Sequence, residues 1–354
     1  MEMMRYWSPA TQALVPYVPG EQPQDQKYIK LNTNESPFPP CEAVKQAIHR
    51  HASDTLRLYP DPEAGELRRT IATHYGVDEA QVFVGNGSDE VLGFSFLAFF
   101  RNGRPIAFPD ITYSFYRVYC DLFDIGYQCP ALTDHYEIDI NDYLPGLGGI
   151  IFANPNAPTG VFTPLAEIET LVRRHPDIVV IVDEAYVDFG AESCVSLVRQ
   201  HPNLLVIQTL SKSRSLAGLR VGFAIGHEDL IAGLNCIKNS FNSYPLDRLA
   251  ICGAVAAFHD QSYFEDCCAE IIRNREWLAA ELESRSYFVP ASRANFLLAK
   301  HQVVDGETLY LHLKSKGILV RHFASARIND FVRITIGKKD DMQRLVETLD
   351  CLHR

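Results

Sequence analysis

Ser211-Lys212-Ser213-Arg214-Ser215-Leu216-Ala217-Gly218-Leu219-Arg220 sets one lysine eight residues before one arginine in a short segment that contains a glycine. A lysine attacks a carbonyl only when it is neutral and held in place. The hydroxyl of Ser211 and the guanidinium of Arg220 are suited to a phosphate dianion. The spacing therefore predicts a site for a cofactor with both an aldehyde and a phosphate, with an ordinary surface loop as the alternative.

An apolar run upstream ends in an acid and then a tyrosine: Val179-Val180-Ile181-Val182-Asp183-Glu184-Ala185-Tyr186. A carboxylate at the end of a buried strand is costly unless it has a partner. The protonated ring nitrogen of pyridoxal phosphate would pair with Asp183, which makes the ring an electron sink. Tyr186 could reach the hydroxyl of the same ring. Alternatively, Asp183 caps a helix and Tyr186 packs at the edge of a core.

The composition indicates a soluble, globular chain with room for more than one domain: 354 residues, 47% hydrophobic, with a mean hydropathy of -0.08. The longest apolar run, residues 91–100, is too short to cross a bilayer, and residues 1–18 lack the pattern of a secretion signal. We therefore expect a cytoplasmic protein with no membrane partner.

The formal net charge of -11 gives no basic footprint for nucleic acid, so an anionic ligand would need local arginines. The nine cysteines form no Cys-x-x-Cys pair, and their odd number argues against a complete set of disulfides. We expect reduced thiols and no metal site.

Short β-branched runs alternate with amphipathic helical stretches through the middle of the chain. This alternation predicts an α/β domain with a mostly parallel central sheet between helices. The expected strands are residues 82–84, 149–153, 178–182, 204–207 and 221–225. The expected covering helices are residues 89–100, 163–175 and 186–201.

The pattern changes after Pro245, where a long helical stretch over residues 263–286 precedes further short strands and helices. We therefore expect an N-terminal arm with a small-domain segment over residues 1–45, a large cofactor-binding α/β domain over residues 46–245, and a small C-terminal α+β domain over residues 246–354. Ligands of open α/β sheets bind beyond the carboxyl ends of the strands, so the loops there hold the candidate residues.

Two more strand-end loops add to the lysine and acid segments. Gly85-Asn86-Gly87-Ser88-Asp89-Glu90 follows a strand and opens a helix, which offers free N–H groups to a phosphate. Asn154-Pro155-Asn156-Ala157-Pro158-Thr159-Gly160 follows another strand. A helix cap or plain turn chemistry explains each loop taken alone. Their occurrence together, in the order that one cofactor requires, favours a shared binding site.

With these segments in place, the chain resembles the fold-type I pyridoxal-phosphate-dependent aminotransferases and, within them, the histidinol-phosphate aminotransferase family. The resemblance runs from about residue 14 to residue 337. Besides the lysine and acid segments, it is carried by Leu14-Val15-Pro16-Tyr17-Val18-Pro19-Gly20, Leu31-Asn32-Thr33-Asn34-Glu35-Ser36-Pro37, Gly317-Ile318-Leu319-Val320-Arg321 and Phe331-Val332-Arg333-Ile334-Thr335-Ile336-Gly337.

The resemblance implies a role for each candidate residue. Lys212 would bond to the cofactor aldehyde and later move the substrate proton. Asp183 would hold the ring nitrogen and Tyr186 the ring oxygen. The remaining implied roles are the cofactor phosphate for Ser88, Asp89, Ser211 and Arg220, stacking on the ring for Tyr113, the phosphate of a partner subunit in a homodimer with shared active sites for Tyr59, and the substrate for Tyr17, Asn34, Arg321 and Arg333.

One position departs from the family pattern. The family usually has an asparagine directly before Pro-Thr-Gly, as a donor to the ring oxygen, and this chain has Ala157 there. Asn156 or Asn154 could take over that contact, or Tyr186 could make it alone.

The resemblance implies transfer of an amino group from L-histidinol phosphate to 2-oxoglutarate, which gives imidazole acetol phosphate and L-glutamate in histidine biosynthesis. One site must then accept a phosphate and a carboxylate, and the guanidinium groups of Arg321 and Arg333 are suited to both. The alternatives are a threonine-phosphate decarboxylase and an aromatic amino acid aminotransferase. A non-catalytic cofactor sensor that acts on DNA is disfavoured, because the chain has no basic patch.

Overall fold

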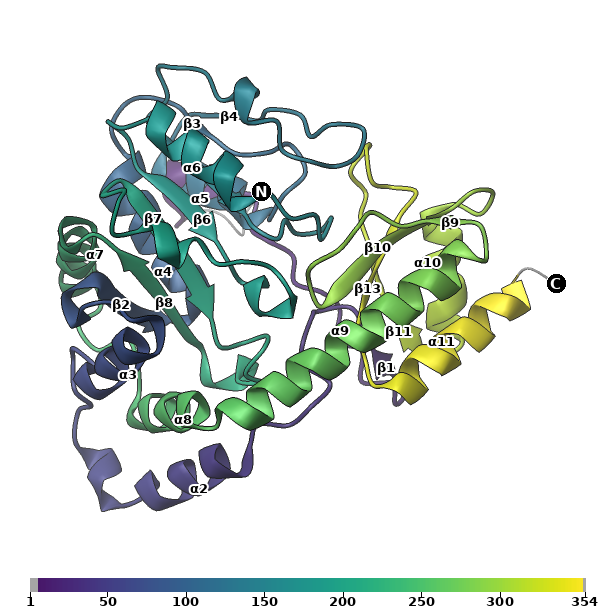
Figure 1. Ribbon diagram of the computed structural model, residues 1–354, viewed down its shortest axis with the longest axis horizontal. Coiled ribbons are helices and arrows are strands. Elements are labelled where there is room, and N and C mark those ends of the chain that lie inside the picture. The colour runs from purple at the N-terminus through teal and green to yellow at the C-terminus, as the bar shows by residue number, and fades with distance from the viewer. Residues whose placement is uncertain (1–5, 353–354) are drawn as a thin grey trace.

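The computed structural model describes residues 6–352, which form a larger and a smaller part (Figure 1). The larger part is built on a seven-stranded sheet in the order β2-β8-β7-β6-β5-β3-β4. Most of its neighbouring strands are parallel, which confirms the predicted fold class. The strands are β2 Val82–Asn86, β3 Ile106–Ala107, β4 Tyr127–Gln128, β5 Gly149–Ala153, β6 Val180–Asp183, β7 Leu204–Thr209 and β8 Val221–Gly226.

Among the described strands of this sheet, β8 alone runs in the direction opposite to the others, so it pairs antiparallel with both β2 and β7. Only residues 210–220 join β7 to β8. A parallel connection needs a crossover of a dozen or more residues, so the shorter link returns the chain in the opposite direction. This link carries Lys212 and lies beyond the carboxyl end of β7.

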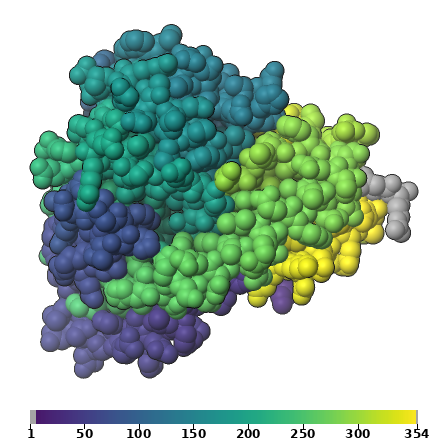
Figure 2. Space-filling view, in the orientation of Figure 1, coloured from purple at the N-terminus to yellow at the C-terminus, as the bar shows by residue number. Residues whose placement is uncertain are grey.

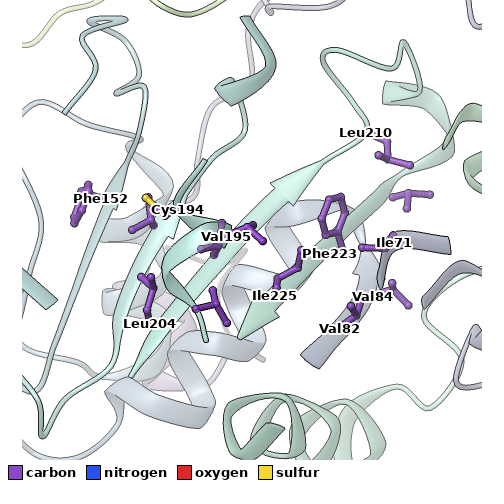
Figure 3. Packing of buried hydrophobic residues seen from close by; sticks show 14 of the residues in the cluster. Ile71, Val82, Val84, Phe152, Cys194, Val195, Leu204, Leu210, Phe223 and Ile225 are labelled. Carbon is purple, nitrogen blue, oxygen red and sulfur yellow. The ribbon is translucent and has the colours of Figure 1, made fainter. Parts of the chain in front are cut away.

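Both faces of the large sheet are buried, as the near-continuous apolar strands predict. Phe152, Leu204 and Phe223 pack on one face, together with side chains of β2 and α3 (Figure 3). Ile151 and Leu205, their sequence neighbours, point to the other face and join a separate cluster. The sheet is therefore the middle layer of a three-layer arrangement, and its carboxyl edge is free to hold a site.

Helices cover both faces of this sheet. The predicted helix over residues 89–100 is a helix, α4, that continues into a π turn, Phe96–Phe100, and the one over residues 163–175 is α6. The helices of the larger part are α2 Glu42–His51, α3 Gly65–Tyr75, α4 Gly87–Ser95, α5 Phe115–Phe123, α6 Leu165–Arg174, α7 Glu228–Phe241 and α8 Arg248–His259.

The predicted helix over residues 186–201 is wrong. The segment forms two 3-10 turns instead, Val187–Phe189 and Cys194–Leu197. Gly190, at a φ of 101°, ends the first turn. The buried carboxylate of Glu184 then accepts hydrogen bonds from Ser193 Oγ and Cys194 N, each 2.6 Å long, which holds the chain in a loop against the sheet.

The long helix α9, Gln261–Glu283, runs from the larger part onto the smaller part (Figures 1 and 2). Before it, α8 packs on α2 and α3, and its side chains Ala254 and Phe258 belong to the core of the large sheet. The buried side chains of α9, among them Ile271 and Leu278, belong to the core of the smaller part. The change of core along the chain thus falls at α9 and not at residue 245.

The smaller part contains an antiparallel sheet in the order β12-β13-β10-β9. The N-terminal segment reaches this part as well, because β1 pairs in parallel with β11. Side chains alternate along residues 331–336, since Val332 and Ile334 are buried in the core and Arg333 faces the cavity described below. The elements of this part are β1 Ile29–Lys30, β9 Tyr287–Phe288, β10 Phe296–His301, α10 Gly306–Ser315, β11 Ile318–Leu319, β12 Arg321–His322, β13 Val332–Thr335 and α11 Lys339–Leu352. The short helix α1, Pro9–Ala13, precedes them in the chain and has no buried residue.

None of the helices within residues 6–352 combines the length and the apolar character that a membrane span requires.

Candidate active site

A cavity of about 530 Å³ is lined by the carboxyl edge of the large sheet, by the N-terminal segment and by the small sheet. It brings together most of the side chains that the sequence singled out. Tyr59 and Asn156 are outside its lining. The predicted residues that line it are Tyr17, Asn34, Ser88, Asp89, Tyr113, Asp183, Tyr186, Ser211, Lys212, Arg220, Arg321 and Arg333.

Lys212 extends into this cavity from the link between β7 and β8. A main-chain hydrogen bond of 3.0 Å from Leu216 N to Leu210 O closes the loop that carries it. Its Nζ donates to the carbonyl of Thr33 at 3.1 Å and lies 5.9 Å from the centre of the Tyr186 ring. The amine is therefore held inside the cavity by one weak contact, which leaves it able to reach a carbonyl carbon.

Asp183 ends β6 and is almost fully buried. Its Oδ2 accepts a 2.8 Å hydrogen bond from the hydroxyl of Tyr116, and its Oδ1 accepts one of 3.2 Å from Ala185 N. Burial raises the pKa of Asp183 to about 6, against the effect of these two donors. A buried carboxylate with neutral partners that also faces a cavity suits a cationic N–H group.

A second group of donors surrounds the first turn of α4. Ser88 lies in the first turn of this helix and lines the cavity, as does Ser211, whose Oγ is hydrogen-bonded to Thr209 Oγ1 at 3.0 Å. Arg220 Nη2 forms an ion pair of 3.1 Å with Asp89 Oδ2. A Cβ atom at Gly87 would collide with the Arg220 guanidinium, so only glycine lets the arginine approach the helix terminus. Free N–H groups, hydroxyls and a guanidinium together suit a phosphate.

Asp89 is an acceptor and cannot donate a hydrogen bond to a phosphate through its side chain. Its Oδ1 accepts a 2.9 Å hydrogen bond from the hydroxyl of Tyr113, and its Oδ2 holds Arg220. The carboxylate therefore orients a cation and an aromatic wall of the cavity. Tyr17 meets the Tyr113 ring edge-on, with the ring centres 6.5 Å apart.

Tyr186 and Asn34 form another wall of the cavity. The hydroxyl of Tyr186 accepts a 3.0 Å hydrogen bond from Asn34 Nδ2, and the ring contacts Phe296 edge-on. Asn34 adopts a φ of 57°, and its main-chain N–H is held by Thr335 Oγ1 at 3.0 Å. Because Asn34 already supplies a donor, the proton of the Tyr186 hydroxyl is free to point into the cavity.

The predicted contact of Asn156 with a cofactor is not supported by its position. Its Nδ2 donates to Ile111 O at 2.9 Å and to Thr159 Oγ1 at 3.1 Å, and its Oδ1 accepts from Thr112 Oγ1 at 2.9 Å. These bonds hold two loops together and occupy both polar atoms of the amide. Ala157 lines the cavity in its place.

Asn154 is also committed to the loop, since its amide exchanges hydrogen bonds of 3.1 and 2.8 Å with the main chain of Thr163. Of the alternatives that the sequence left open for a donor to the ring oxygen, only Tyr186 lines the cavity.

Tyr59 lies at the surface, outside the cavity of its own chain. Its side chain is 79% exposed and stacks on Tyr244, with the ring centres 4.7 Å apart. Leu58 and Phe241 are also exposed. An exposed apolar surface of this kind is typical of an interaction site.

Arg321 and Arg333 stand opposite each other on β12 and β13. Arg333 Nη2 donates to Asn32 O at 2.9 Å, while its Nε is buried without a hydrogen-bond partner. Burial lowers the pKa of Arg333, and the charge of Arg321 acts in the same direction. An unpaired N–H on a buried cation is costly, so an anion that enters the cavity would stabilise this pair.

Sequence reasoning missed three residues of the site. Tyr116 follows Tyr113 by three residues, a helical spacing that could have indicated a shared face. Thr209 ends β7 and could have been found as a strand-end residue. Thr33, which accepts from Lys212 through its main chain, gave no sequence signal, because every residue has a carbonyl.

These residues fit pyridoxal phosphate. The fit rests on the chemistry of the donors: Lys212 for the aldehyde, Asp183 for the ring nitrogen, and the donors around α4 for the phosphate. Arg321 and Arg333 are then left for a second anion.

Comparisons with known proteins agree with this arrangement. The sequence model of the family "Aminotransferase class I and II" matches residues 26–349. A histidinol-phosphate aminotransferase from Pseudomonas aeruginosa is 54% identical over 99% of both chains, and one from Clostridium beijerinckii is 50% identical over 98% of this chain and 97% of its own. The crystal structure of histidinol-phosphate aminotransferase from Sinorhizobium meliloti, in complex with pyridoxal-5'-phosphate, superimposes with a TM-score of 0.88 at 23% identity and 98% coverage of each chain. The chain therefore belongs to the class I and II aminotransferase family.

Proposed function

We propose that this enzyme transfers the amino group of L-histidinol phosphate to 2-oxoglutarate, with pyridoxal phosphate as its cofactor. The observation that carries the proposal is one cavity that contains a lysine, a buried acid and two separate groups of cations. Arg220 ends the link that leads into β8 of the large sheet, and Arg321 and Arg333 belong to the small sheet. Relatives named histidinol-phosphate aminotransferase, at 50% identity and above over nearly the whole chain, support this substrate.

Bound pyridoxal phosphate would supply an aldehyde and an electron-withdrawing ring. Lys212 would hold it through Nζ, and Asp183 would keep a proton on the ring nitrogen. Lys212, once displaced by the substrate amine, would take the proton from the substrate Cα and return it to the carbon that was the cofactor aldehyde. Tyr186, with its hydroxyl already accepting from Asn34, would donate to the ring oxygen.

The second group of cations accounts for the two substrates. Histidinol phosphate carries a phosphate where glutamate carries its α-carboxylate, and planar guanidinium groups bind either anion. Arg333 has its free Nε for this purpose, and Arg321 stands beside it. Tyr17 would contact the substrate and Tyr113 would stack on the cofactor ring, since both side chains line the cavity.

We further propose that the enzyme is a cytoplasmic homodimer in which Tyr59 reaches the cofactor phosphate of the partner subunit. Tyr59 is exposed and lies outside the cavity of its own chain. Exposed apolar side chains are also found at Leu56 and Leu58, just before Tyr59, and at Phe241, just before its stacking partner Tyr244. Burial of this surface against a second copy would stabilise the pair.

A single comparison tests the substrate. Purified protein is given histidinol phosphate, tyrosine or threonine phosphate, each with and without 2-oxoglutarate, and glutamate and CO2 are measured. The proposal expects the highest kcat/KM for glutamate formation with histidinol phosphate. Release of CO2 from threonine phosphate without an acceptor would assign a decarboxylase instead, and a higher kcat/KM with tyrosine would assign an aromatic aminotransferase.

A further inference from the structure

The two residues after Lys212 are both anchored, although neither lines the cavity. The hydroxyl of Ser213 donates to Asp188 Oδ2 at 2.5 Å. Asp188 belongs to the 3-10 turn Val187–Phe189, which directly follows Tyr186. This bond joins the loop that carries the lysine to the turn that directly follows Asp183 and Tyr186 in the chain.

Arg214 supplies the second anchor. Its side chain is buried, and its guanidinium lies between two rings, 4.2 Å from the centre of Phe258 and 4.0 Å from that of Phe264. Nη1 donates to Ala257 O at 2.7 Å, in the last turn of α8, and Nη2 donates to Gln261 Oε1 at 3.3 Å, at the first residue of α9. Arg214 therefore fills the junction between the two helices.

Burial of a guanidinium group costs free energy unless hydrogen-bond acceptors surround it, so a buried arginine is not expected in an ordinary surface loop. The contacts of the Arg214 side chain indicate its structural role. Lys212 lies in a loop that the Leu210–Leu216 main-chain bond closes, and Ser213 and Arg214 fasten that loop to two different elements. The backbone at Lys212 is thereby fixed, while its long side chain stays free to move.

The same long helix supports the turn after Tyr186. Arg275 of α9 donates from Nη1 to Phe189 O at 2.7 Å and to Ala294 O at 3.0 Å. The first residue of α9 bonds to Arg214, and the middle of α9 bonds to the turn after Tyr186. The helix therefore supports both the loop that carries Lys212 and the turn next to Tyr186, the two side chains that must face one cofactor ring.

We propose that Arg214 is a positioning residue for Lys212, which sets where Nζ stands relative to Asp183 and Tyr186 by tying the lysine loop to the α8–α9 junction. The proposal rests on the proposed function only in taking Lys212 as the reactive amine. Misplacement of a reacting group by about 1 Å costs roughly 10²-fold in rate. Loss of the anchor should therefore lower kcat more than it raises KM.

The test compares the wild-type holoenzyme with Arg214→Lys, Arg214→Met and Ser213→Ala. For each protein, kcat, KM, the melting temperature and the pH titration of the visible absorbance of bound cofactor are measured. Arg68→Met is the matched control. Arg68 likewise makes two hydrogen bonds, in its case to the main-chain carbonyls of Val82 at 3.0 Å and Glu79 at 2.8 Å, and it lies outside the cavity lining.

We expect Arg214→Met to lose roughly 10- to 100-fold in kcat, with a displaced absorbance titration. Arg214→Lys should have a kcat and an absorbance titration between those of Arg214→Met and the wild type, because lysine keeps the charge but lacks the planar guanidinium group. Arg68→Met should lower the melting temperature and leave kcat and the titration as in the wild type. If Arg214→Met does not fold, Ser213→Ala and Arg214→Lys carry the test, since each makes a smaller change.

The proposal is overturned if the Arg214 and Ser213 variants change only the melting temperature, as Arg68→Met does. Failure of the proposed function is a different result: the wild type would then form no glutamate from histidinol phosphate. The absorbance titration needs no turnover, so it would still report whether Arg214 positions Lys212.

Discussion

The hydroxyl of Tyr116 donates a hydrogen bond of 2.8 Å to Oδ2 of Asp183, and both side chains are buried. Tyr116 lies in α5 and Asp183 ends β6, so the bond joins a covering helix to the edge of the sheet where the site is built. Burial raises the pKa of Asp183 to about 6, and the Tyr116 hydroxyl opposes that rise because it favours the charged carboxylate. The bond helps to decide how much of Asp183 is charged near neutral pH.

Tyr116→Phe removes this donor and keeps the ring. In the cofactor-free protein, Asp183 should then titrate at a higher pH than in the wild type. A raised carboxyl pKa contributes stability that is present below the unfolded value of 3.8 and is lost as the pH rises through about 6. In the variant this loss should extend to higher pH. Near pH 8 its free energy of unfolding should be lower than that of the wild type by roughly 1.5–3 kcal/mol, because a hydrogen bond to a charged group is missing.

Carboxyl-carbon NMR of labelled aspartates and urea unfolding at several pH values measure these two effects. Asp183→Asn assigns the resonance. Tyr119→Phe is a matched control, since its hydroxyl donates to the main chain of Asp89 at 2.6 Å from the same helix. An Asp183 midpoint that stays at the wild-type value in Tyr116→Phe would contradict the prediction.

Lys212→Ala should abolish turnover and leave the fold intact. The lysine is expected to move the substrate proton, and loss of a general acid–base group costs roughly 10²–10⁴-fold. Its Nζ makes one hydrogen bond, to Thr33 O, so the free energy of unfolding should fall by no more than about 3 kcal/mol. Borohydride reduction followed by mass spectrometry should attach the cofactor at residue 212 in the wild type only. Appreciable residual transamination would speak against the assigned role.

Arg333→Lys should raise KM for histidinol phosphate and for 2-oxoglutarate together. Lysine keeps the charge but lacks the planar fork, and its amine cannot replace both Nη2, which holds Asn32 O, and the buried free Nε. Loss of a hydrogen bond to a charged group corresponds to roughly a 10- to 100-fold rise in KM. Steady-state kinetics with each substrate varied in turn measure the effect. Arg344→Lys, at an exposed position of α11, is the control, and a rise for only one substrate would mean that the two anions bind at different places.

Sequence patterns predicted what depends on neighbouring residues. Continuous apolar runs located β5 closely, and the spacing of Lys212 from Arg220 placed both in one cavity. The contacts that fix chemistry were not predictable, because they join distant segments. Asn156 Nδ2, for example, donates to the carbonyl of Ile111, 45 residues earlier in the chain. Neither partner of such a bond leaves a signal in its own segment.

The wrong helix over residues 186–201 has the same cause. The apolar residues of this segment have a helical spacing. However, the main-chain N–H of Cys194 donates to the carboxylate of Glu184 and not to a helical carbonyl. Gly190 adopts the positive φ that this loop requires at little cost in free energy, because glycine has no Cβ atom. Without that loop Asp188 would not stand where Ser213 meets it, so the irregular segment is part of the site's support.

The ion pair between Arg327 and Asp110 should hold the segment after β12 against the large sheet. Arg327 Nη1 lies 2.5 Å from Asp110 Oδ2, and its Nη2 donates to Leu132 O at 2.9 Å. Phe323 and Ile328 of the same segment line the cavity. Arg327→Gln should therefore raise KM for both substrates, by roughly two- to fivefold because the pair is partly exposed.

A double-mutant cycle of Arg327→Gln with Asp110→Asn, read as kcat/KM, measures the coupling. The coupling should weaken as salt is raised to about 1 M, since screening then acts over a few ångströms. Lys300→Gln is the control, because its partner Asp330 lies in the same small part of the chain at 2.9 Å. Strict additivity of the Arg327 and Asp110 variants at low salt would rule the prediction out.

Gly222→Ala should weaken cofactor binding from beneath the site. Gly222 lies in β8, and a Cβ atom there would collide with the main chain of Gly87 and Ser88 at the start of α4. The helix terminus would have to move, and overpacking of this kind costs roughly 1–3 kcal/mol. The N–H groups around Ser88 would move with it, so the dissociation constant for pyridoxal phosphate should rise together with the loss of stability. Gly218→Ala is the matched control, because a Cβ atom there meets no atom within 4 Å. Fluorescence titration of the cofactor-free proteins measures the dissociation constant for pyridoxal phosphate in each variant. Equal affinities in the two variants would show that the phosphate is not held at the start of α4.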